Sequence, residues 1–91
     1  MKKYIIEREI PGVDRMGQAD LAAAAKTSNA ALKQLAPRAQ WVQSYVARDK
    51  TFCVYLAESE EAIHEHARLS GFPANKITEI VGVIDPTTER G

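Results

Sequence analysis

Hydrophobic and polar side chains alternate along residues 3–10, which is the two-residue period of a β-strand. Pro11-Gly12 ends this strand. Residues 18–35 instead carry apolar and small side chains at helical spacing, so they predict an amphipathic helix. Pro37 cannot continue a helix and marks its end.

The middle of the chain predicts a β-hairpin. Residues 40–47 and 51–57 are rich in aromatic and β-branched side chains, and only Arg48-Asp49-Lys50 separates them. Two strands joined by so short a turn pair antiparallel.

A second helix follows over residues 59–70, with Ser59 as its N-cap. Its end is the best-marked in the chain, because Gly71-Phe72-Pro73 supplies a glycine for the left-handed position, then a hydrophobic residue and a proline. Residues 77–84 predict the last strand, and residues 85–91 a loose tail.

The resulting order, strand–helix–strand–strand–helix–strand, predicts an α+β fold of the ferredoxin-like class. Two right-handed crossovers joined by a hairpin give a four-stranded antiparallel sheet with both helices on one face. We expect one domain over residues 1–91.

The central strands are apolar on both faces. On residues 51–57, one face carries Phe52, Val54 and Leu56 while the other carries Cys53 and Tyr55. Strict alternation in the preceding strand groups Trp41 with Tyr45. Two helices cover only one face, so we expect the second face, with Tyr45 and Tyr55, to be buried in a homodimer. The alternative is that these aromatics are ordinary surface residues.

Charge and composition exclude several partners. The 12 basic and 12 acidic side chains cancel, which argues against nucleic acid and anionic membranes. Residues 50–55 faintly resemble the basic-aromatic strand of RNA-recognition domains but lack its glycine. No apolar stretch approaches the roughly 20 residues of a membrane span. Cys53 is the only cysteine, so an internal disulfide is impossible and a cytoplasmic location is expected.

Few residues are candidates for chemistry. Cys53 is either a soft thiolate ligand or a small buried hydrophobe. Helical spacing turns His66 inward and His64 outward, so the two imidazoles do not share a metal. An inward histidine is either a ligand or a hydrogen-bonded core residue. Motifs such as HExxH, a glycine-rich phosphate loop or a nucleophile elbow are absent.

Three segments together resemble a family of small bacterial proteins described as nickel-binding or nickel-responsive. They are residues 41–46 (WVQSYV), 50–55 (KTFCVY) and 65–73 (EHARLSGFP). The resemblance implies a ferredoxin-like, dimeric α+β barrel and the binding of a divalent transition metal, nickel. Because nickel accepts mixed sulfur, nitrogen and oxygen ligands, we expect Cys53, His66 and Tyr45 as its ligands.

The alternative function is that of a cofactor-free enzyme of the dimeric α+β-barrel type, a monooxygenase or isomerase. It requires a pocket of at least about 300 Å³ between sheet and helices that reaches solvent near His66. Trp41, Tyr55 and Ser28 are the side chains expected to line it. A third hypothesis is a ligand-binding or interaction module with no chemistry. Nickel binding is the favoured of the three hypotheses.

Overall fold

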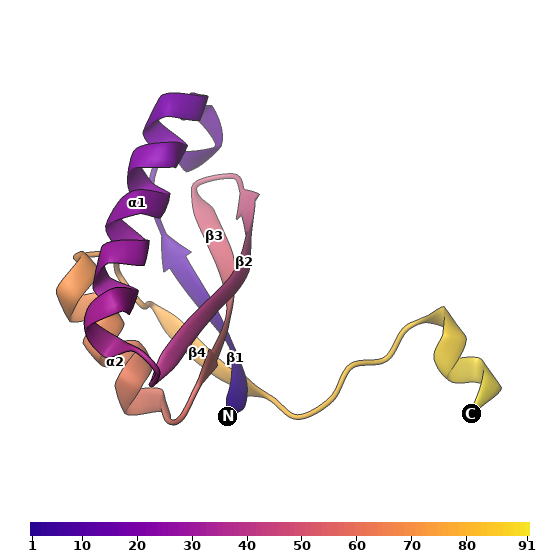
Figure 1. Cartoon of the computed structure of the whole chain (residues 1–91). Coiled ribbons are helices and arrows are strands. Elements are labelled where there is room, and N and C mark those ends of the chain that lie inside the picture. Colours follow the sequence, from indigo (N-terminus) through magenta and orange to yellow (C-terminus); the bar gives the residue numbers. More distant parts are fainter.

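The computed structural model describes residues 1–91 and has the element order predicted from the sequence (Figure 1). The strands are β1 (Lys2–Glu9), β2 (Ala39–Ala47), β3 (Lys50–Ala57) and β4 (Lys76–Ile80). The helices are α1 (Gln18–Leu35) and α2 (Glu60–Ser70), with short 3₁₀ turns η1 (Val13–Arg15) and η2 (Pro86–Arg90). No helix is long and apolar enough to cross a membrane.

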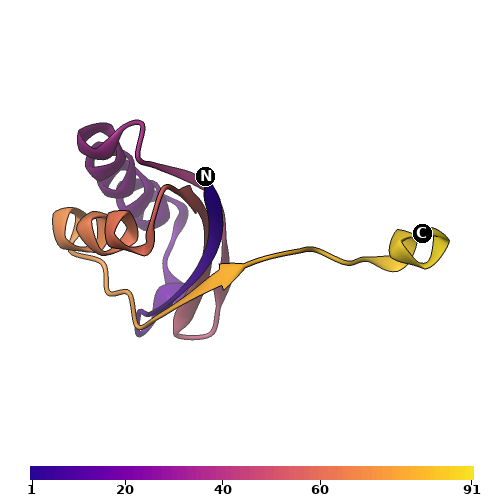
Figure 2. The same cartoon turned by 90° about the horizontal axis from the view of Figure 1, so that it is seen from below.

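The four strands form one antiparallel sheet in the order β2-β3-β1-β4. Strand β1 therefore lies inside the sheet, where Ile6 pairs with Cys53 of β3 on one side and with Ile77 of β4 on the other. Both helices cover the same face, and the opposite face carries no helix (Figures 1 and 2). The predicted ferredoxin-like α+β architecture is confirmed.

The helix-covered face holds the core. Tyr4 and Ile6 of β1 are buried there, as are Cys53 and Tyr55 of β3. The placement of Tyr55 corrects the expectation that it lies on the open side. Alternation defines two faces of a strand but does not say which one the helices cover.

A β-bulge in β2 corrects a second expectation. The register shifts between Trp41 and Gln43, which leaves Val42 as the extra residue. Trp41 pairs with Tyr55 on the helix-covered face, whereas Tyr45 pairs with Phe52 on the other. Because a bulge changes the parity of alternation, Trp41 and Tyr45 lie on opposite faces.

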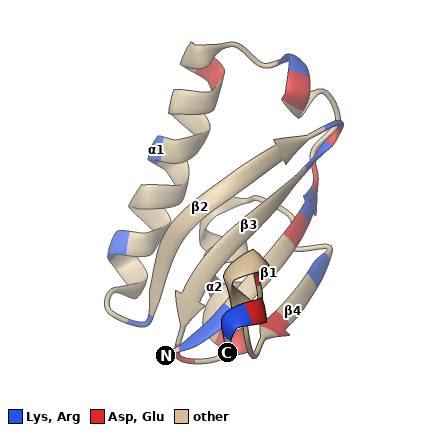
Figure 3. Cartoon of the chain, turned by 90° about the vertical axis from the view of Figure 1, so that its right-hand side faces the viewer, with Lys and Arg blue, Asp and Glu red and all other residues tan.

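We call the helix-free side of the sheet the open face. Its apolar side chains include Ile5, Tyr45, Phe52, Val54, Leu56 and Ile80. Figure 3 shows that the charged residues of the sheet gather along β1, β4 and the β2–β3 turn, which leaves most of β2 and β3 uncharged.

Helix α2 has the phase and the end that the sequence predicts. His66 and Ile63 are fully buried, and His64 is exposed. Gly71 is the C-cap, with φ of 80°, and its N–H donates to the Ala67 carbonyl. A glycine reaches this left-handed conformation without steric cost.

Strand β4 is shorter than predicted. It ends at Ile80 rather than at residue 84, because Ile80 pairs with Lys3 and β1 begins only one residue earlier, at Lys2. Val81, Val83 and Ile84 are therefore exposed. The chain leaves the sheet on the side away from the helices and ends in η2, which Asp85 caps (Figure 2).

Candidate functional site

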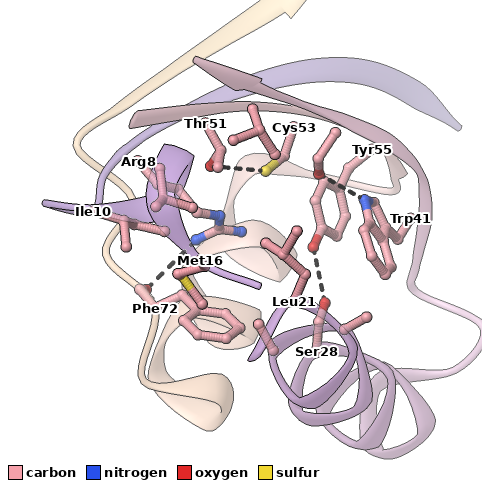
Figure 4. Close-up of a pocket in the computed structure, with 15 residues that line it drawn as sticks. Arg8, Ile10, Met16, Leu21, Ser28, Trp41, Thr51, Cys53, Tyr55 and Phe72 are labelled. Carbon is pink, nitrogen blue, oxygen red and sulfur yellow. Dashed lines mark hydrogen bonds between the residues drawn. The ribbon is translucent and has the colours of Figure 1, made fainter. Parts of the chain in front are cut away.

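A cavity of about 270 Å³ lies between the helices and the sheet, slightly below the volume that the enzyme alternative requires. Its walls are mostly hydrophobic and come from η1, α1, the strands β1, β2 and β3, and the loop after α2 (Figure 4). The cavity is lined by three side chains that the sequence predicted for it, namely Trp41, Tyr55 and Ser28.

A hydrogen-bonded group of Ser28, Tyr55 and His66 joins three elements beside this cavity. Ser28 Oγ on α1 lies 3.2 Å from the Tyr55 hydroxyl on β3 and 3.1 Å from His66 Nε2 on α2. The Tyr55 hydroxyl is 3.5 Å from the same nitrogen, and the two rings are tilted with centroids 5.1 Å apart. His66 belongs to this group because it lies on the face of α2 that packs against the sheet. It does not line the cavity itself.

Burial keeps this group uncharged at neutral pH. It lowers the pKa of His66 to about 4, with a further contribution from the positive charge of Arg8. Burial also raises the pKa of Tyr55, so its hydroxyl remains protonated. An imidazole with so low a pKa is a weak general base at pH 7. His66 is therefore a poor candidate for a general base at neutral pH.

Arg8 is the buried charged residue of the candidate site that sequence reasoning missed. It stands between Glu7 and Glu9 on the interior strand β1, and it is only 2 % exposed. Its Nη1 donates to the carbonyls of Pro73, at 2.8 Å, and Phe72, at 3.5 Å. Its Nη2 has no hydrogen-bond partner. The signal that could identify it is the position of Arg8 in phase with Tyr4 and Ile6.

Two further polar contacts lie on the cavity wall. Cys53 is buried, and its Sγ lies 3.4 Å from Thr51 Oγ1. Trp41 Nε1 donates to Ser44 Oγ over 2.9 Å. Both pairs are internally satisfied, so their polar atoms need no ligand.

Comparison with known proteins identifies the family. Residues 4–80 match the family model described as "Nickel responsive protein SCO4226-like". The chain belongs to this family. The resemblance predicted from the sequence motifs is thereby confirmed, and with it membership of a group named for its response to nickel.

A solved structure of similar fold comes from the same family. The crystal structure of SCO4226 from Streptomyces coelicolor A3(2) superposes with a TM-score of 0.74 at 19 % sequence identity. The match covers 90 % of this chain and 99 % of that one, and it establishes the shared fold. No curated protein matches the chain.

The three side chains expected to bind nickel, Cys53, His66 and Tyr45, lie in different parts of the structure. The structure does not bring the three expected ligands together. Tyr45 is 57 % exposed on the open face and accepts a hydrogen bond from Gln43, whereas Cys53 and His66 are buried on the helix side. No group of three histidine, cysteine or carboxylate side chains is arranged to hold a metal within one chain.

One pair of donors does meet on the surface. His64 Nε2 lies 3.4 Å from Glu60 Oε2, one turn apart on α2, and both side chains are well exposed. Residues four apart face the same side of a helix, so an imidazole and a carboxylate are presented together there.

Proposed function

We propose that the protein binds nickel, and that Glu60 and His64 on α2 provide the protein ligands. Family membership over residues 4–80 supports the choice of metal. The observation that carries the site is the 3.4 Å approach of His64 Nε2 to Glu60 Oε2 on an exposed helix surface. Neutral imidazole and carboxylate oxygen are both ligands that Ni²⁺ accepts.

The electrostatics of the interior disfavour His66 as an alternative ligand. The positive charge of Arg8 contributes to the low pKa of His66, which means that it opposes a proton on that ring. It would oppose a divalent cation in the same place even more strongly. The exposed donors Glu60 and His64 form an ion pair only with each other.

Two protein donors leave most of the nickel coordination shell to water, so this site is expected to bind weakly. Helix α2 lies on the opposite side of the sheet from the open face (Figure 2). A dimer formed through the open face would therefore not bring the two α2 helices together, and each chain would bind nickel on its own.

The open face supports a second element of the proposal, a homodimer. Its apolar side chains, which include Ile5, Val54 and Leu56, are left without a covering layer by the two helices. An apolar surface of this kind usually marks an interface, and two copies of one sheet are self-complementary about a two-fold axis.

Calorimetric titration of NiCl₂ into the untagged protein tests the metal proposal. We expect binding in the wild type that is lost in His64→Ala and weakened in Glu60→Gln, and that is unchanged in Cys53→Ala. Loss of the heat in Cys53→Ala alone would move the site into the cavity. No heat in the wild type would refute nickel binding.

A further inference from the structure

We propose that the cavity between the helices and the sheet binds a small organic acid, whose carboxylate pairs with Arg8 and whose apolar body fills the rest of the space. This site is separate from the nickel site proposed on α2 and does not depend on it.

The first argument is the charge of Arg8. A buried guanidinium is normally paired with a carboxylate, because an unpaired buried charge is costly. Arg8 belongs to none of the ion pairs of the protein. Its neighbours Glu7 and Glu9 point to the other face of the strand. Its compensation comes from two backbone carbonyls and from the ring of Tyr55, whose centroid is 5.8 Å from Cζ.

The second argument is the free hydrogen-bonding capacity on the same side chain. Nη1 is occupied by the loop after α2, but Nη2 is buried without a partner while Arg8 lines the cavity. Figure 4 shows the guanidinium group reaching into the space between Met16 and Tyr55. Ser28 and the Tyr55 hydroxyl also line the cavity, but they are bonded to each other. Arg8 therefore carries the one buried side-chain donor among the cavity-lining residues that has no hydrogen-bond partner.

The remaining wall sets the character of the ligand. Ile10, Val13, Met16, Leu21 and Phe72 surround the cavity with apolar surface. A volume of about 270 Å³ equals that of roughly nine water molecules at ~30 Å³ each. A compact acid of about ten non-hydrogen atoms matches this space, with an aromatic or short aliphatic body.

The charge also sets the sign of the ligand. A carboxylate would neutralise Arg8 and form a charge-assisted hydrogen bond in a site of low dielectric constant. A cationic ligand would meet an uncompensated positive charge, and a neutral one would leave Nη2 without an ionic partner.

Phenylacetate and its neutral isostere phenylacetamide are suitable probes, because they differ only in the group that would face Arg8. Trp41 is the only tryptophan and lines the cavity, so its fluorescence and its indole N–H signal report binding there. The titration is run without metal on the wild type, on Arg8→Met, and on Arg90→Met, which removes one exposed charge from the tail.

We expect phenylacetate to perturb Trp41 and to bind at least about tenfold more tightly than phenylacetamide, which is the size expected for a hydrogen bond to a charged group. The same preference should persist in Arg90→Met and disappear in Arg8→Met. Equal affinity of the two probes in the wild type would overturn the proposal, as would the absence of any response of Trp41 up to about 10 mM, the weak limit for a ligand of this size. The comparison of probes in the wild type decides the matter even if Arg8→Met does not fold.

Discussion

His66 Nε2 lies 3.1 Å from Ser28 Oγ, and this contact ties α2 to α1 beneath the sheet. Both residues are buried, and the hydroxyl of Tyr55 completes the group from β3. One small polar cluster thus connects the two helices with the central strands, at the place where the cavity ends.

Replacing Ser28 by alanine should destabilise the fold. The change removes the partner of two buried polar groups, so we expect a loss of about 1–3 kcal/mol in the free energy of unfolding. Thr27→Ala is the matched control, because Thr27 is exposed and its hydroxyl bonds only to the carbonyl of Ala23 in the same helix. Urea denaturation measures both variants. Equal midpoints for the two variants would show that the cluster contributes nothing to stability.

The low pKa of His66 makes stability depend on pH. The pKa is about 4 in the folded chain and near 6.5 in the unfolded one, so the unfolded chain binds more protons between these values. The neutral His66 ring makes its full contribution to the free energy of unfolding above pH 6.5. This contribution is lost as the pH falls toward 4. This loss is on the order of 3 kcal/mol.

Denaturation curves between pH 7 and 4 test this expectation. The His66→Gln variant should lose that part of the pH dependence, whereas His64→Gln, on the exposed face of the same helix, should keep it. Parallel pH profiles for the wild type and His66→Gln would contradict the account.

The sequence pattern predicted the element order because each signal was local. Gly71-Phe72-Pro73 ends α2 through a backbone conformation that glycine allows. His66 and His64 follow the phase of a single helix. Helix phase and helix ends depend on residues three or four positions apart in the sequence, so they can be predicted before the fold is known.

The errors arose where the answer depends on distant partners. Arg8 is buried because it shares the helix-covered face of the interior strand β1 with Tyr4 and Ile6, and alternation alone does not show which face the helices cover. A bulge opposite β3 places Trp41 and Tyr45 on opposite faces of the sheet. The length of β4 is set by the residue at which its partner β1 begins. The candidate site was partly anticipated through Ser28, Trp41 and Tyr55. Its charged group was not.

The proposed dimer can be disrupted by a single charge. Val54 lies in the middle of the open face, so Val54→Lys should convert a particle of twice the 10.0 kDa chain mass into a monomer. Thr27→Lys adds the same charge on an exposed part of α1 and should leave the dimer intact. Sedimentation at micromolar concentration measures both. A wild-type particle of 10.0 kDa would refute the dimer.

The most direct test of the nickel proposal is to locate the ion. Octahedral Ni²⁺ is paramagnetic and broadens the NMR signals of nuclei close to it, so a ¹H–¹⁵N spectrum with substoichiometric NiCl₂ maps the site. We expect the amide signals around Glu60 and His64 to broaden first, while the indole N–H of Trp41 in the cavity remains sharp. Stronger broadening of the Trp41 indole N–H and of the Cys53 amide than of the amides around Glu60 would contradict the assignment and place nickel in the interior.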